Sequence, residues 1–63
     1  MEMTLVEAFF HARKQDVSTL LRVLEFYQEE HDEVPISCSL VVMGIDEDAL
    51  EIASSKNINV IKL

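Results

Sequence analysis

The 63-residue sequence is poor in the residues that hold small proteins together, since it has one cysteine, one glycine and one proline. A single cysteine, Cys38, cannot form an internal disulfide, and no clustered Cys and His spacing predicts structural zinc. A domain of this size buries only about 60% of the surface that its unfolded chain exposes. With 49% hydrophobic residues, we expect one small domain, residues 1–63, stabilised by a well-packed core or by a partner chain.

Long hydrophobic runs are also missing from the sequence. No stretch approaches the roughly 20 apolar residues that a membrane helix needs. The short apolar run 5–12 contains Glu7 and lacks the basic start and the cleavage site of a signal peptide. A lone cysteine is typical of a reducing compartment. We therefore expect a cytoplasmic protein without membrane contact.

Positive charge is scarce and unevenly placed. Twelve acidic and five basic residues give a net charge of −7, and residues 25–51 contain acidic residues but no lysine or arginine. Such a surface repels a phosphate backbone and an anionic membrane, so independent nucleic-acid binding is not expected. The simplest interpretation of the acidic stretch is a solvated surface. An alternative is a regulator that mimics nucleic acid and occupies a basic partner.

The middle of the chain predicts a helix followed by a strand. Apolar residues recur at helical spacing over residues 17–32, with Asp16 as the expected N-cap and Pro35 as the stop. Residues 36–43 contain a continuous apolar run, typical of a strand covered on both faces, and Gly44 is expected to break it.

A second helix and a last strand follow. The run Asp46–Asp48 provides an N-cap acid and further acids in the first turn, where the helix dipole favours negative charge. Asn57 is expected to end this helix in a left-handed conformation. Residues 58–63 then predict a short strand.

Residues 3–12 allow two interpretations. Their alternation favours a strand with Leu5, Glu7 and Phe9 on one face, and Val6 and Phe10 on the other. The near-heptad spacing of apolar residues also fits one continuous helix over residues 4–32. We favour the strand.

The expected architecture is therefore α/β, with the order β-α-β-α-β and a small, mostly parallel three-stranded sheet. Right-handed crossovers in sequential strand order put both helices on one face of the sheet. The other face would be bare and apolar, so we expect a homodimer that covers it. A helix order that covers both faces of a monomer is the alternative. The residues expected at the interface are Phe9, Phe10, Leu24, Phe26 and Val41.

Several segments together resemble a known family. They are 5–9, the helix start 15–17, the helical residues 25–27, and the runs 40–42, 48–53 and 58–61. In pattern and spacing they are similar to the C-terminal half of a restriction-endonuclease-like nuclease domain, as in small uncharacterised archaeal and bacterial proteins of that superfamily. The likeness covers residues 5–62 and rests on pattern more than on a motif.

The resemblance implies an incomplete catalytic site. The family carries a Glu-x-Lys pair on a strand, in which the Glu binds a divalent metal with an upstream Asp and the Lys helps the attacking water. Glu7 matches the Glu position, but Phe9 stands at the Lys position, and no upstream strand precedes Glu7 to supply the Asp. The resemblance thus implies a truncated, inactive relative.

No other residue pattern predicts a catalytic or cofactor site. His11 and His31 lack ligand-like neighbours at helical spacing, and Cys38 has no adjacent base that would activate it. A single glycine followed by acids argues against a phosphate-binding loop. We expect no metal or cofactor and a non-catalytic interaction or structural module. The alternative is a metal-dependent nuclease that uses Glu7 and is active only as an assembled oligomer.

Overall fold

The computed structural model describes residues 3–63. Its elements alternate along the chain as β1 (Met3–Ala12), α1 (Lys14–Glu30), β2 (Ile36–Ile45), α2 (Glu47–Ser55) and β3 (Asn59–Lys62). The strands form one sheet in the order β1-β2-β3, and both neighbouring pairs are parallel. The predicted β-α-β-α-β fold with a three-stranded parallel sheet is confirmed.

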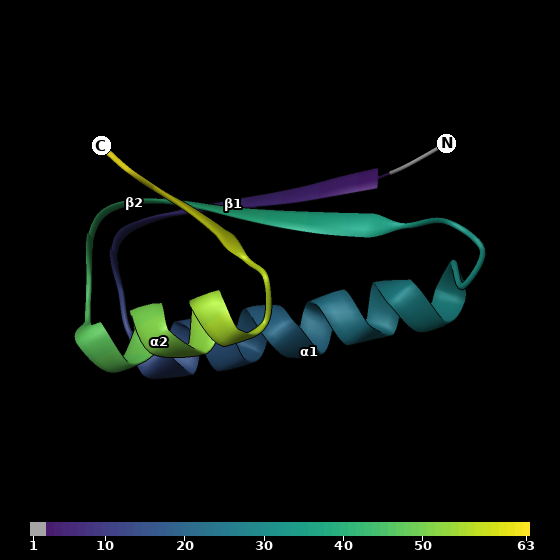
Figure 1. The fold of residues 1–63 in the computed structure, drawn as a ribbon, viewed down its shortest axis with the longest axis horizontal. Coiled ribbons are helices and arrows are strands. Elements are labelled where there is room, and N and C mark those ends of the chain that lie inside the picture. Colours follow the sequence, from purple (N-terminus) through teal and green to yellow (C-terminus); the bar gives the residue numbers. More distant parts are fainter. Residues whose placement is uncertain (1–2) are drawn as a thin grey trace.

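The two helices lie side by side on one face of the sheet (Figure 1). β1 runs along the whole of β2, from the pair Met3–Ile36 to the pair Ala12–Ile45. β3 is shorter and pairs only with residues 39–42 of β2. The sheet therefore has one helix-covered face and one face on which no helix or strand of residues 3–63 lies.

Residues 3–12 form a strand, as favoured from the alternation of their side chains. Leu5 and Phe9 point toward the helices and pack against the core, whereas Val6 and Phe10 point away and are 57% and 80% exposed. The continuous-helix alternative is wrong, because these residues pair with β2 over the length of both strands.

The core lies between the sheet and the two helices. The side chains of Leu40, Val17 and Val42 are its largest fully buried members. Ala49 and Ala53 on α2 are completely buried, since their small side chains allow α2 to approach the sheet closely. The core is completed by Ala12, Leu20, Cys38 and Ile58.

The start of α1 differs from the prediction. The helix begins at Lys14 with Arg13 as N-cap, and Asp16 stands at the third helical position. Its carboxylate Oδ2 accepts the backbone N–H of Arg13 at 2.9 Å, as the acid of a capping box does. Asp16 satisfies a free amide at the helix start, but from inside the first turn rather than as its cap.

Gly44 does not break β2, which continues to Ile45. A Cβ atom on Gly44 would lie 2.7 Å from Nδ1 of His11, so the glycine leaves room for the imidazole against the strand backbone. Asp46 is the N-cap of α2, as expected for an acid at this point. Asn57 has a φ of 59°, which confirms the predicted left-handed residue after α2.

Candidate functional site

The sheet face turned away from the helices is the candidate functional site, and we call it the bare face. Alternation along each strand and the register of the sheet assign its residues. Leu63 belongs to it because its N–H donates to the carbonyl of Val42 and continues the ladder of β3. The bare face consists of Thr4, Val6, Ala8, Phe10, Ser37, Ser39, Val41, Met43, Asn59, Ile61 and Leu63.

The bare face is graded from polar to apolar along the strands. At the end where the strands begin, the hydroxyl oxygens of Thr4 and Ser37 lie 3.1 Å apart and hydrogen-bond each other. At the other end Phe10, Met43 and Leu63 are 80%, 55% and 77% exposed. The residues of the bare face include no charged side chain.

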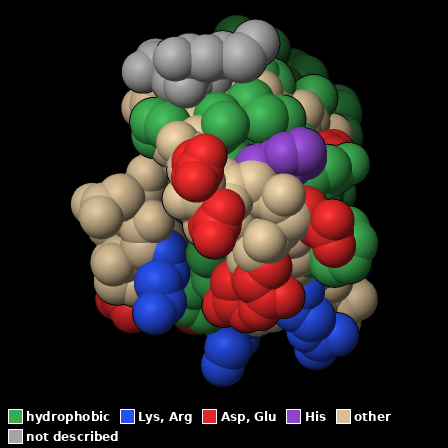
Figure 2. Space-filling model, turned by 90° about the vertical axis from the view of Figure 1, so that its right-hand side faces the viewer, with side chains coloured by type: hydrophobic (Ala, Val, Ile, Leu, Met, Phe, Trp, Pro, Cys, Tyr) green, Lys and Arg blue, Asp and Glu red, His purple; other side chains and the backbone are tan. Residues whose placement is uncertain are grey.

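This distribution is unusual for a protein with many acidic residues. Hydrophobic side chains gather over the sheet, and the charged side chains cluster around the helices (Figure 2). All-parallel sheets are almost always covered on both faces, because their strands are apolar on both sides. Large contiguous exposed apolar surfaces are typical of interaction sites, which makes this face the candidate.

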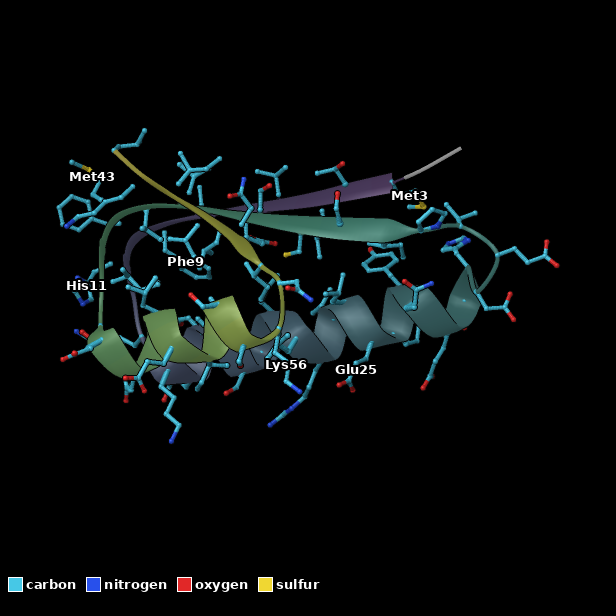
Figure 3. The ribbon with its side chains drawn as sticks, viewed as in Figure 1. Met3, Phe9, His11, Glu25, Met43 and Lys56 are labelled. Atoms are coloured by element: carbon cyan, nitrogen blue, oxygen red, sulfur yellow. The ribbon has the colours of Figure 1, made fainter. Side chains whose placement is uncertain are left out.

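The residues predicted at the interface fall in three places. Phe10 and Val41 lie on the bare face, whereas Phe9 and Leu24 pack against the core between the sheet and the helices. Phe26 lies on α1 and is 59% exposed, away from the bare face. Figure 3 shows Phe9 between the sheet and the helices, and Met43 on the opposite side.

The prediction did not include Val6, Met43, Ile61 and Leu63, which make up much of the exposed apolar surface. Alternation places Val6 on the face of Phe10 and Met43 on the face of Val41, but it does not tell which face of a strand meets the helices. Ile61 follows only when the register is known, because the register places it beside Val41. The sequence contains the alternation of side chains along each strand, but the pairing of the strands is needed to assign the residues of the bare face.

Glu7 lies on the helix side of β1, at the outer edge of the sheet. It lines a hollow of about 180 Å³ together with Phe9, Asp16, Thr19, Leu20 and Val23. Phe9, at the position of the family's lysine, packs against the core. Among residues 3–63, no group of three or more His, Cys, Asp and Glu side chains is placed to hold a metal ion.

A His–Asp pair lies at the end of the sheet where β1 and β2 finish. Nε2 of His11 lies 2.6 Å from Oδ1 of Asp46, although the two residues are 35 positions apart. Because the carboxylate of Asp46 is directed at His11, it makes no capping hydrogen bond to α2. Sequence spacing does not reveal this pair, because the pairing of β1 with β2 brings it together.

Cys38 lies on the helix side of β2 and is buried in the core. Burial, and to a smaller extent the negative charge of Glu7, raises the pKa of its thiol above the usual value of 9.0. A thiol with a raised pKa is a weak nucleophile at neutral pH, so Cys38 acts as a core residue.

No family model matches the chain, and no curated protein or solved structure matches it. The resemblance to restriction-endonuclease-like domains therefore stays a prediction. Within the part of the chain that the structure describes, neither helix is long and apolar enough to cross a membrane.

Proposed function

We propose that the protein is a non-catalytic, self-associating interaction module that packs its bare face against the bare face of a second copy. The observation that carries the proposal is an all-parallel sheet with both helices on one face and exposed apolar side chains on the other. Burying Phe10, Met43 and Leu63 would remove three mostly exposed apolar side chains from water, at roughly 25 cal/mol per Å².

Charge favours a contact between the bare faces of two copies over a contact between their helices. Each chain carries a net charge of −7, so two copies repel one another wherever acidic surfaces meet. The helices carry most of the acidic residues of the chain, whereas the bare face has none. Sheet-on-sheet packing, with about 10 Å between the sheets, is therefore the contact that two such chains make with least repulsion.

The test is the oligomeric state at micromolar concentration. Met43→Glu and Phe10→Glu each place a charge on an exposed position of the bare face, and we expect both variants to lose face-to-face association. Ser54→Glu adds the same charge on the exposed side of α2 and is the matched control, expected to associate like the wild type. A wild type that is folded and monomeric at this concentration contradicts the proposal.

Salt separates self-association from capture of a basic partner. Screening weakens the repulsion between two chains of like charge, so association of copies should tighten between 50 and 500 mM salt, on the order of several-fold. An acidic nucleic-acid mimic that binds a basic partner would instead weaken steeply over the same range. A decrease in self-association with salt argues against contact through the uncharged face.

A second candidate is a metal-dependent nuclease that assembles its site across copies. The observation in its favour is that Glu7 and Asp16 line the same open hollow. Cleavage of DNA in the presence of Mg²⁺ or Mn²⁺ that is lost in Glu7→Gln supports it. No cleavage by the wild type, or equal cleavage by Glu7→Gln, removes it.

We also propose that the protein works in the cytoplasm. Cys38 is a free thiol in the core, and free thiols persist where the surroundings are reducing.

A further inference from the structure

β1 forms a long outer edge of the sheet. It is ten residues long and contains no proline or lysine, two of the devices that keep other strands from an edge, and Glu7 on its helix side is its one acidic residue. The N–H of Met3 donates to the carbonyl of Pro35, on the β2 side. Because backbone groups alternate in direction along a strand, the N–H and C=O groups of Thr4, Val6 and Ala8 point outward from the sheet.

α1 extends beneath this edge with apolar surface that the sheet leaves uncovered. Val23 and Tyr27 on α1 are 37% and 40% exposed. The hollow beside Glu7 is lined only by residues of β1 and α1, so it opens at the outer edge of β1. A strand added next to β1 would place side chains into this hollow and over Val23.

We infer that β1 pairs edge to edge with the β1 strand of a second copy, antiparallel, to give one sheet that is continuous across two copies. This inference rests on the proposed function, because it extends the bare face that the proposal uses. A two-fold axis perpendicular to the sheet keeps all helices on one side and joins the two bare faces into one surface.

The side chains restrict the register of this pairing. With all helices on one side, residues of the same face stand opposite each other, so a register centred on Glu7 would oppose two like charges. A register centred on Ala8 avoids this by placing Glu7 opposite the partner's Phe9. It also sets Val6 opposite the partner's Phe10, an aromatic and β-branched pair of the kind that stabilises strand pairing.

The area of the bare face favours this second contact, because a dimer held by two bare faces alone would be weak. At the usual spacings in a sheet, the residues of the bare face cover roughly 350 Å² in projection. Two such faces packed together cover about 700 Å² in projection, and two joined faces packed against two others cover about 1,400 Å². Accessible area exceeds projected area on a surface made of side chains, so the first contact is small for a stable interface, whereas the second reaches the range of about 1,200–2,000 Å². A tetramer with two kinds of contact is therefore the assembly that we expect.

Proline at Ala8 tests the edge pairing directly. The N–H of Ala8 points away from β2, so Ala8→Pro removes an edge donor without removing a hydrogen bond of the sheet. The two lost hydrogen bonds per pair of copies, together with the ring at the edge, should weaken this contact by about a hundredfold. Ala8→Val adds similar bulk but keeps the N–H, and is the matched control.

The experiment is sedimentation of five proteins: the wild type, Ala8→Pro, Met43→Glu, the double variant and the control Ala8→Val. We expect a tetramer, two different dimers, a monomer and a tetramer, respectively. A dimer that Met43→Glu dissociates and Ala8→Pro leaves intact overturns the edge pairing but leaves the proposed function standing. A dimer that only Ala8→Pro dissociates supports the edge pairing and removes face packing, and a monomeric wild type overturns both.

Hydrogen exchange gives a measurement that needs no proline. The amides of Thr4, Val6 and Ala8 face the outer edge of β1, beside which residues 3–63 place no strand, so they should exchange fast at low concentration. In the Met43→Glu dimer we expect their protection to rise with protein concentration, by at least about tenfold. Fast exchange of these amides in every associated form overturns the inference, whatever Ala8→Pro does to folding.

Discussion

The imidazole Nε2 of His11 lies 2.6 Å from Oδ1 of Asp46, so a side chain near the end of β1 contacts the N-cap residue of α2. Both side chains are about half exposed, and exposed pairs contribute only about 0.2–1 kcal/mol. The pair therefore orients the chain at this end of the sheet more than it stabilises the fold. Gly44 makes the arrangement possible, because the ring lies where a Cβ atom of residue 44 would be.

Gly44→Ala should destabilise the protein through His11. The added Cβ would lie 2.7 Å from Nδ1, so the ring must move and its hydrogen bond to Asp46 is lost. We expect a loss of about 0.5–1 kcal/mol in the free energy of unfolding, measured with urea. In a His11→Ala background the same substitution should cost little, and an equal cost in both backgrounds contradicts the explanation.

Two acids of α1 should respond in opposite directions to the same substitution. Asp16→Ala removes the carboxylate that accepts the N–H of Arg13, and should lower the free energy of unfolding by about 1 kcal/mol. Glu30→Ala removes a negative charge from the last residue of α1, a helix without a basic residue in its last turn. It should therefore raise the free energy of unfolding by roughly 0.3 kcal/mol. Chemical denaturation at low salt measures both. A loss of equal size in the two variants would mean that the helix dipole and the capping contact are not the cause.

Asn57 should tolerate glycine but not alanine. Its φ of 59° lies in the left-handed region, which costs a residue with a Cβ about 1–2 kcal/mol. Asn57→Ala should therefore destabilise the protein by about 1 kcal/mol, whereas Asn57→Gly should change it by less than about 0.5 kcal/mol. Thermal unfolding of the two variants side by side decides the point.

Cys38 predicts a loss of stability at alkaline pH. Burial raises the pKa of the thiol in the folded protein above 9.0, so the folded chain keeps a proton that the unfolded chain releases. The contribution of Cys38 is complete below pH 9.0 and is lost as the pH rises from there toward the raised pKa of the folded state. Unfolding in urea between pH 7 and 10.5 should show a steeper decline for the wild type than for Cys38→Ala. Parallel curves for the two proteins would contradict the burial of the thiol.

The elements and the order of the fold are readable from the sequence because their signals are local. The apolar periodicity of α1, the continuous apolar run of β2 and the left-handed Asn57 each depend on a few neighbouring residues. The start of α1 is different, because Asp16 is a favourable N-cap and also a favourable third residue of a capping box. The choice between the two depends on where Arg13 leaves β1, which the local sequence does not determine.

The residues of the candidate site could be predicted only in part, for a related reason. Alternation separates Phe10 from Phe9, but the bare face also depends on which phase of β1 meets the helices. His11 and Asp46 show the same limit, since neither residue has a partner until β1 and β2 are aligned. Gly44 was interpreted as a strand break, whereas its role is to admit the imidazole of a neighbouring strand.

The shortness of β3 limits how far such an assembly can grow. β3 has four residues, ends at Lys62, and pairs with none of the first residues of β2. An edge of this kind is a poor template for a further strand. Pairing through β1 uses up the one long edge in a self-complementary contact, so neither edge remains to propagate a filament. Such a pairing would favour closed assemblies of fixed size over the open-ended stacking of strands that leads to amyloid.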